Sequence, residues 1–585
     1  MGKKIGGTPR LRRSWKRAAC AAMLGLALAG CGGGNEGSEP SASADEAVAM
    51  AEDAQAARLK GGSLSVLGAY RLADQATFGA SEKLLTELGK GTAEQWINSQ
   101  FVVAASRYAS GGTNAIHTYT GSDFCADNGT ANCWNFYYSS QPLAWDFYRN
   151  AVSGNDQLRQ RVALALSQIN VVSQLEVEGT YGLRNWHNNF ITNAFGNYRT
   201  VLKKVALSPV MGDYLNNVNN NKTAPNENFA RELLQLFAIG TCELEQDGSL
   251  KGGKCQATYD NARVREYAFA LTGWTYPPGG KSAWCAPRNG INCRFYDGDM
   301  VARPAAHDSA TRKLLGTVSV PAGSTAEAAL ESVLDSLMAH PNMAPFIGRQ
   351  LIQHLVTSNP SAGYVARVSY AFNTGRYGRI GTGVKGDLRA TVTAILLDQE
   401  ARGDSPPAQA GRLREPVQFF AGVLRALNGT TDGEPLTWWW GEALGQHVFR
   451  PPSVFNYYRP DYPVAGTQLQ GPQFGILNAN TGLARINYVN YLVNWGGSAA
   501  STNVPNALPT QVNLDPFLLD ASDPAKLVDR MVRVGLGGRI TPAARQTIIN
   551  AVAAWTASNS SSYLKERVKT AAYLVFASPQ YQIAR

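Results

Sequence analysis

The sequence predicts a mostly α-helical protein with long loops and few, short strands. In many segments apolar residues recur at alternating three- and four-residue spacing, which is the pattern of one buried helix face. Segments that alternate apolar and polar residues, as a half-buried strand does, are scarce and short. The chain has 585 residues, of which 44% are hydrophobic. We therefore expect a large, multi-helical globular body.

The first 30 residues have the composition of a secretory signal peptide. Seven Lys or Arg residues and no acidic residue accompany an apolar run from Ala18 to Leu28. Leu28-Ala29-Gly30-Cys31 follows and is typical of a bacterial lipoprotein, in which Cys31 takes a lipid and becomes the mature N-terminus. A cleaved signal peptide followed by a chance cysteine is the alternative. Because Gly32 is not an aspartate, we expect transfer to the outer membrane, by analogy with enterobacterial sorting.

Residues 31–60 are rich in Gly, Ser, Ala and Glu and poor in large apolar side chains, which predicts a flexible tether. We expect one folded body over residues 61–585. One face of its first clear helical segment is apolar: Leu158, Val162, Ala165, Ile169 and Val172. Asn155 or Asp156 is placed to cap this helix. Six later segments follow the same spacing: Ala329–Met338, Ala344–Val356, Leu388–Leu397, Val417–Leu427, Ala543–Trp555 and Val568–Phe576.

Six cysteines lie in the predicted body, in pairs that are close in sequence: Cys125/Cys133, Cys242/Cys255 and Cys285/Cys293. An even number of cysteines in an exported protein indicates disulfides. We expect the three local bridges, because short loops close at the smallest entropic cost. A zinc site is the alternative, but no Cys-x-x-Cys or His-x-x-x-His spacing supports it.

The charge of the chain argues against nucleic acid as a partner. The formal net charge is +10, and seven positive charges lie in the predicted signal peptide, which leaves about +3 for the mature chain. A nucleic-acid-binding protein needs a concentrated basic face. No segment after the signal peptide approaches the ~18 apolar residues of a membrane-spanning helix. We therefore expect attachment to the membrane through Cys31 alone.

The segment from Asn226 to Gly240 is the first candidate for chemistry. As a helix it places Glu227, Arg231 and Glu232 on one polar arc, opposite an apolar face. If the arc faces a cleft, either carboxylate can act as a general base and the guanidinium can bind an anion or tune a pKa. The alternative is a solvated helix face, stabilised by a Glu227–Arg231 pair and ended by Gly240.

His307-Asp308 is the second candidate, as an orienting pair for acid/base catalysis. The alternative is that Asp308 only caps the next structural element. The other histidines are scattered without metal-ligand spacing: His117, His187, His340, His354 and His447. Gly381-Thr382-Gly383-Val384-Lys385-Gly386 fits a dinucleotide-binding pattern, but no strand precedes it. We expect no cofactor and no metal.

Aromatic residues are plentiful in the predicted loops, among them Trp134, Trp145, Trp186, Trp274, Trp284, Trp438, Trp439 and Trp440. Exposed rings of this kind stack on sugars or on partner proteins. The alternative is that these large side chains cover the core.

Seven blocks from about residue 65 onward form an ordered pattern with the 226–240 segment. They are Gln75-Ala76-Thr77-Phe78-Gly79 with Trp96; Leu158-Arg159-Gln160-Arg161-Val162-Ala163; Ala270-Leu271-Thr272-Gly273-Trp274; His307-Asp308 with Lys313; Arg414-Glu415-Pro416; Gly445-Gln446 with Pro451-Pro452-Ser453-Val454; and Ala577-Ser578-Pro579-Gln580-Tyr581. This pattern resembles the bacterial family known as domain of unknown function 1800. The resemblance implies an exported, mostly helical protein and brings no activity with it. Where the family tends to have Gly-Trp after Val454, this chain has Asn456-Tyr457-Tyr458.

Two functions follow as hypotheses. The first is a lipid-anchored envelope protein that binds or assembles an envelope polymer, such as a polysaccharide, or a partner protein. The second is an acid/base enzyme acting on a polysaccharide or related polymer through Glu227, Arg231 and Glu232, with His307 and Asp308. The first is preferred, because no catalytic constellation is complete in the sequence.

Overall fold

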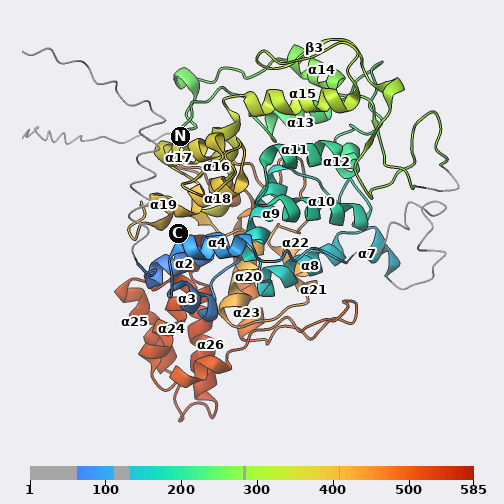
Figure 1. Cartoon of the computed structure of the whole chain (residues 1–585). Helices are drawn as coiled ribbons and strands as arrows, with labels where there is room; N and C mark the ends of the chain where they lie inside the picture. Colours follow the sequence, from blue (N-terminus) through green and yellow to red (C-terminus); the bar gives the residue numbers. More distant parts are fainter. Residues whose placement is uncertain (1–61, 111–124, 126–131, 281–284, 408) are drawn as a thin grey trace, which may run out of the picture. The chain divides into compact units, whose positions relative to one another are not determined.

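The structure is a computed structural model that describes residues 62–110, 125, 132–280, 285–407 and 409–585. Its contacts divide the chain into Met1–Ser43, which lies outside the described residues, and Ala44–Arg585. The predicted signal peptide, Cys31 and the predicted tether also lie outside the described residues. Within Ala44–Arg585 the described part is mostly helical, which confirms the predicted fold class (Figure 1).

The helices before residue 215 are α2 (Val66–Ala76), α3 (Glu82–Leu88), α4 (Ala93–Phe101), α7 (Cys133–Tyr137), α8 (Gln141–Ser153), α9 (Gln157–Ile169), α10 (Thr180–Asn193), α11 (Tyr198–Leu207) and α12 (Pro209–Tyr214). Those of the middle part are α13 (Asn228–Gln235), α14 (Asn261–Ala270), α15 (Ala326–Ala339), α16 (Met343–Leu355), α17 (Ala362–Thr374), α18 (Leu388–Leu397) and α19 (Gln399–Arg402). The last group is α20 (Pro416–Ala426), α21 (Glu434–Thr437), α22 (Trp439–Ala443), α23 (Ala479–Val493), α24 (Pro524–Leu536), α25 (Pro542–Ala553), α26 (Tyr563–Phe576) and α27 (Pro579–Gln582). Short 3-10 helices lie at η1 (Lys251–Gly253), η2 (Pro304–Ala306), η3 (Pro472–Ile476) and η4 (Asp515–Asp520).

The described strands are two residues long and form antiparallel pairs. They are β1 (Trp274–Thr275) with β2 (Val301–Ala302), β3 (Arg312–Lys313) with β4 (Ser319–Val320), and β5 (Arg412–Leu413) with β6 (Ile583–Ala584). In the third pair Arg412 lies opposite Ala584 and Leu413 opposite Ile583. This pairing attaches the segment before α20 to the segment after α27.

The predicted helical segments correspond to helices of the structure, and Leu388–Leu397 matches α18 residue for residue. The first segment differs in detail, because α9 ends at Ile169, before Val172. Asp156 occupies the N-cap position of α9 but makes no capping hydrogen bond. Its carboxylate instead accepts from the Ser106 backbone N–H (2.8 Å) and from Gln160 Nε2 (3.0 Å). Asp156 is completely buried. The two donors, one from the loop at Ser106 and one from α9 itself, replace the hydrogen bonds that water would donate to its carboxylate.

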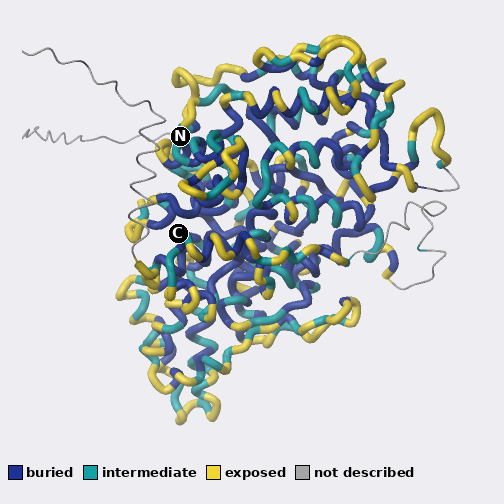
Figure 2. The backbone as a smooth tube through the Cα atoms, viewed as in Figure 1, coloured by how far each residue is buried: buried dark blue, intermediate teal, exposed yellow. Residues whose placement is uncertain are grey.

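Helix α9 lies near the centre of the described part. It packs against α4, α8, α10 and α16, and nearly all of its residues are buried. In Figure 2 buried residues continue from here through α18 and α20. By contrast, α24, α25 and α26 pack mainly on one another, beside α2. The buried apolar side chains of all these helices belong to one hydrophobic cluster.

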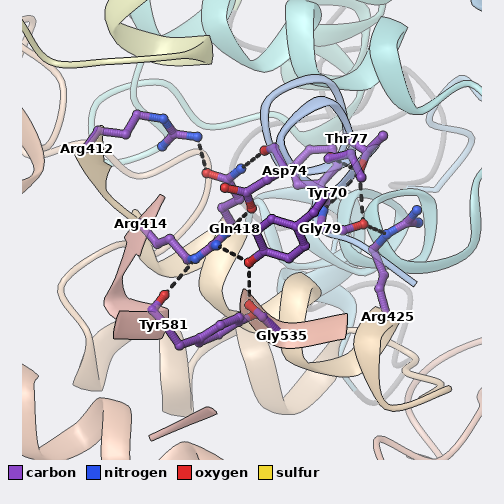
Figure 3. Close-up of polar contacts among 12 residues, drawn as sticks. Tyr70, Asp74, Thr77, Gly79, Arg412, Arg414, Gln418, Arg425, Gly535 and Tyr581 are labelled. Carbon is purple, nitrogen blue, oxygen red and sulfur yellow. Dashed lines mark hydrogen bonds and ion pairs between the residues drawn. The ribbon is translucent and has the colours of Figure 1, made fainter. Parts of the chain in front are cut away.

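A buried polar network joins α2 to the last elements of the chain (Figure 3). Arg414 forms an ion pair with Asp74, and each side chain is 2% exposed. The same guanidinium donates to the Tyr581 carbonyl (2.7 Å) and to the Tyr70 hydroxyl (2.9 Å). Tyr70 donates in turn to the Gly535 carbonyl. We call these five residues the end clasp, because they connect α2, α24 and α27 to the segment between β5 and α20.

Three disulfides join Cys125 to Cys133, Cys242 to Cys255 and Cys285 to Cys293. These are the predicted local pairings, which are thereby confirmed. Disulfides persist in oxidising compartments, so they indicate an exported protein. Searched over the described residues, the structure contains no helix with the length and apolarity needed to cross a membrane.

Three histidines are enclosed by the helical body. The ring of His187 lies 4.2 Å from that of Phe449, and its Nε2 is buried without a hydrogen-bond partner. Burial lowers the pKa of His187 to about 3. Burial likewise lowers the pKa of His354 and of His447 to about 4. All three side chains are therefore neutral at pH 7.

The end clasp leads to a prediction on stability. Replacing Arg414→Met leaves the Asp74 carboxylate buried and unpaired, so we expect a loss of about 3–5 kcal/mol in the free energy of unfolding. Arg459→Met is the matched control, since the Arg459–Asp461 pair is 64% and 54% exposed, and we expect it to cost less than about 1 kcal/mol. Urea unfolding followed by circular dichroism measures both. Equal losses in the two variants would contradict the assigned role of the clasp.

The buried histidines predict a loss of stability in mild acid. Below pH ~6.5 each of these histidines is protonated in the unfolded chain but stays neutral in the folded chain. The free energy of unfolding therefore falls as the pH drops toward 4. In His187→Gln one such proton is removed. We expect the decrease between pH 6.5 and 5 to be smaller than in the wild type by about 1–2 kcal/mol. Urea unfolding at both pH values tests this, and identical decreases would refute it.

Candidate functional site

A small pocket lies where the end of α9, helix α16 and the loop before η3 meet. Its volume is about 60 Å³. The lining residues are Gln168, Ile169, Leu236, Phe346, Gln350, Gln353, His354, Val454, Phe455, Asn456, Tyr458, Pro460, Pro472 and Gln473. Amides are abundant among them, and none of the lining side chains is a carboxylate, a lysine or an arginine. The pocket therefore presents a neutral and mainly apolar surface that includes amides and aromatic rings.

The Glu415 carboxylate lies behind this pocket and is almost fully buried. Its Oε2 accepts hydrogen bonds from Gln168 Nε2 (2.8 Å), Gln446 Nε2 (2.8 Å) and the Tyr458 hydroxyl (3.0 Å). Its Oε1 lies 3.6 Å from Nη1 of Arg161. We call Glu415 and the pocket it supports the Glu415 site.

The backbone conformation fixes Glu415 from both sides. Pro416 occupies the first turn of α20, where a proline is compatible with the helix, and Glu415 is the extended residue that precedes it. On the other side, Arg414 is held in the end clasp (Figure 3). The Glu415 side chain is therefore anchored by a helix start and by a buried ion pair of its neighbour.

The charges around Glu415 keep it ionised. Burial raises the pKa of Glu415, but the guanidinium groups of Arg161 and Arg412 and the hydrogen bonds from Gln168 and Gln446 outweigh this effect and give a net lowering. An ionised carboxylate only accepts hydrogen bonds. Each group that contacts it must therefore present a donor.

This requirement decides how the amides of the pocket are oriented. Gln168 donates a hydrogen bond from Nε2 to Glu415. Its other amide atom, Oε1, is buried and has no hydrogen-bond donor. The Tyr458 hydroxyl donates its only proton to Glu415. In its hydrogen bond with Gln473 the same hydroxyl is therefore the acceptor. Oε1 of Gln473 is also buried and unpaired. Two carbonyl oxygens of the pocket thus lack a donor.

Two further polar atoms of the lining have no partner, namely Gln350 Nε2 and His354 Nδ1. Burial lowers the pKa of His354 to about 4, and the positive charges of Arg161 and Arg412 act in the same direction, against Glu415. The imidazole is therefore neutral at pH 7. These four atoms have almost no accessible surface, so they do not face the open space of the pocket. The pocket itself, with its amide side chains and the exposed Phe455 ring, is the candidate ligand site.

The predicted arc on the 226–240 segment lies elsewhere. Helix α13 is shorter than predicted and ends at Gln235, with turns continuing to Gly240. Phe229 and Leu233 are buried as expected, and Leu236, which is half-buried, lines the pocket. Leu236, on the apolar face of this segment, therefore belongs to the Glu415 site.

The Glu227–Arg231 pair, at 3.0 Å, lies at the surface with side chains 37% and 39% exposed. These two side chains therefore do not line an enclosed cleft, as the catalytic hypothesis required, and agree with the alternative of a solvated helix face, because exposed ion pairs form readily on a short helix without enclosure. Glu232 is different: burial raises its pKa, Arg231 only partly opposes this, and Oε2 is buried without a partner. Its assignment as a general base stays a prediction.

His307 and Asp308 do not orient one another. His307 is buried, and its Nδ1 lies 2.8 Å from the Thr272 carbonyl. The Asp308 carboxylate receives two hydrogen bonds from Arg312, at 2.7 and 2.8 Å. Burial raises the pKa of Asp308, but the hydrogen bonds and charge of Arg312 outweigh this and lower it. Among the described residues no hydrogen bond or ion pair links His307 or Asp308 to the Glu227–Glu232 arc.

Most of the predicted aromatic surface is core. Trp145, Trp186, Trp274 and Trp440 are buried, whereas Trp134 and Trp439 are exposed. His117 and Trp284 lie outside the described residues. Over the described part, no cluster of three His, Cys, Asp or Glu side chains is arranged to hold a metal ion.

The sequence analysis did not single out Glu415, Gln168 or His354 as site residues. A signal was present at Arg414-Glu415-Pro416, where two charged residues precede a mainly apolar helix start. Charged residues in such a context are buried only when they are paired. The partners lie far away in the sequence, so the pocket itself is visible only in the fold.

Comparison with known proteins agrees with the sequence pattern. The family model described as "Protein of unknown function (DUF1800)" matches residues 71–583. No curated protein and no solved structure matches the chain. The matched region contains the Glu415 site and the end clasp except Tyr70. The chain therefore belongs to the DUF1800 family of proteins of unknown function.

Proposed function

We propose that this chain is a lipid-anchored envelope protein that binds a neutral envelope polysaccharide through the Glu415 site. The observation that carries the proposal is an uncharged pocket whose lining combines amide side chains with the exposed ring of Phe455. Such a lining can bind the hydroxyl or amide groups of a sugar, and neither partner has to give up a charge.

The rim of the pocket supports a sugar ligand. Phe455 lines the pocket and is 40% exposed, so part of its ring faces solvent. An accessible aromatic face beside polar groups suits the apolar C–H face of a sugar ring. An anchor at Cys31 and a tether over residues 31–60 would hold the body near envelope polymers at the outer membrane. The disulfides agree with an oxidising compartment.

The geometry favours binding over catalysis at this site. A general acid or base must exchange a proton with the substrate, which requires a pKa near the working pH. The pKa of Glu415 is lowered, and its carboxylate is occupied by donors from Gln168, Gln446 and Tyr458. Glu415 is thus suited to hold the amides in position.

The polysaccharide proposal is tested by cosedimentation of the purified full chain with isolated bacterial sacculi, chitin and cellulose. We expect the wild type to cosediment with at least one polymer. Phe455→Ala removes the exposed ring at the rim, and we expect it to weaken binding about tenfold. Trp439→Ala is the matched control, because its exposed ring lies outside the pocket lining, and we expect it to bind like the wild type. Absence of binding to every polymer, or equal binding by Phe455→Ala, would overturn the proposal.

The anchoring proposal is tested separately with Cys31→Ala. Without the lipidated cysteine the protein has only its folded body, so we expect it to move from the membrane fraction to the soluble fraction with an unchanged unfolding midpoint. Fractionation followed by a carbonate wash measures this. A variant that stays in the washed membranes would show that Cys31 is not the anchor.

A further inference from the structure

We infer that a second pocket, lined by residues of α3, α4, α8, α9 and α20, binds a negatively charged sugar unit. Its volume is about 230 Å³. It shares no lining residue with the Glu415 site, and its surface is mainly polar, whereas that of the Glu415 site is mainly apolar. We call it the Arg425 pocket, after the enclosed cation in its lining. The inference is independent of the proposed function.

Arg425, in the last turn of α20, is an enclosed cation held by neutral groups. Its Nε donates to the Gly79 carbonyl (2.8 Å; Figure 3) and its Nη1 to the Val152 carbonyl (2.9 Å). Burial lowers the pKa of Arg425 to about 10, so the side chain is charged at pH 7. Among the described residues no carboxylate forms an ion pair with it, and no charged neighbour shifts its pKa. An enclosed ion without a counter-charge is unfavourable, so an anion bound beside it gains free energy.

The lining offers hydrogen-bond donors that the protein itself does not use. Nη2 of Arg425, Nζ of Lys83 and Nε2 of Gln100 make no hydrogen bond to the described part of the chain. The first and the third are not enclosed atoms and keep accessible surface, and Lys83 is exposed. Glu87, also exposed, is the carboxylate of the lining and is outnumbered by the two cations. An ionised acid group only accepts hydrogen bonds, and it therefore matches these donors.

The size and the remaining polar groups favour a sugar over a bare ion. Ser81, Ser153 and Asn155 add hydroxyl and amide groups to the lining. Such groups both donate and accept hydrogen bonds, as sugar hydroxyls require. A single ordered water needs only ~10–15 Å³, so a pocket of about 230 Å³ has room for a ring attached to the anion. The ligand is therefore a sugar unit that bears a carboxylate or a phosphate group.

The experiment measures the binding of glucuronate, glucose 6-phosphate and glucose to the full chain by isothermal titration. The three sugars share a pyranose ring and differ in one substituent, which is a carboxylate, a phosphate ester or a hydroxymethyl group. We expect one or both acidic sugars to bind at least about tenfold more tightly than glucose, because only a charged group compensates Arg425. Their order of affinity shows which acid the pocket takes. Acetate and inorganic phosphate are the controls for the ring, and we expect them to bind more weakly than the matching sugar.

Two variants test the pocket without removing the hydrogen bonds that Arg425 makes to the fold. Lys83→Glu reverses an exposed charge of the lining, and we expect it to weaken acidic-sugar binding about tenfold. Gln100→Glu keeps an oxygen for the Leu158 backbone N–H (3.3 Å) and replaces the unused donor by an acceptor, so we expect a similar loss. Lys90→Glu is the matched control, since Lys90 is an exposed lysine outside the lining, and it should bind like the wild type. Circular dichroism of each variant checks that it is folded.

Four results would overturn the inference. The first is absence of acidic-sugar binding, and the second is equal affinity for the acidic sugars and glucose. The third is acidic-sugar binding that neither Lys83→Glu nor Gln100→Glu weakens. The fourth is binding of acetate or inorganic phosphate as tight as that of the sugars, which would show a site for small ions only. If triglutamate binds in their place, and Lys83→Glu weakens it, the ligand is an acidic peptide. Each of these results leaves the proposal for the Glu415 site standing, because the two pockets share no lining residue.

Discussion

The compensation of two adjacent buried charges, Arg414 and Glu415, determines much of the structure around the pocket. Burying an ion costs free energy unless an opposite charge and good hydrogen bonds accompany it. Arg414 meets this condition with Asp74 of α2 and with oxygens of Tyr70 and Tyr581. Glu415 meets it with Arg161 and three neutral donors. Two adjacent residues thus tie opposite parts of the molecule together.

This arrangement couples the site to the integrity of the whole fold. Glu415, behind the pocket, directly follows Arg414 of the end clasp and lies two residues after Leu413, where β5 pairs with β6. Partly paired buried networks are unfavourable, so the network is expected to form as a unit or not at all. A small pocket can then have well-defined polarity although most of its lining comes from loops and helix ends.

The ionised state of Glu415 has a consequence beyond stability. It imposes a direction on each hydrogen bond that it receives, and through Gln168 and Tyr458 this direction reaches the surface of the pocket. The charge itself is offset by Arg161 and Arg412, and no charged side chain lines the pocket.

The sequence by itself determined the mostly helical class, several of the helical segments and the local cysteine pairs. These features depend on neighbours in the chain: apolar spacing defines a helix face, and a short loop favours closure of a nearby disulfide. The sequence also placed Arg414-Glu415-Pro416 among the blocks that resemble the family, without indicating a role for these residues. The candidate arc at Glu227, Arg231 and Glu232 was chosen from local spacing, and two of its members form an exposed ion pair. Only the tertiary structure brought Gln168, His354, Glu415 and Gln473 together, because the free energy of a buried polar atom depends on partners that are distant in the sequence.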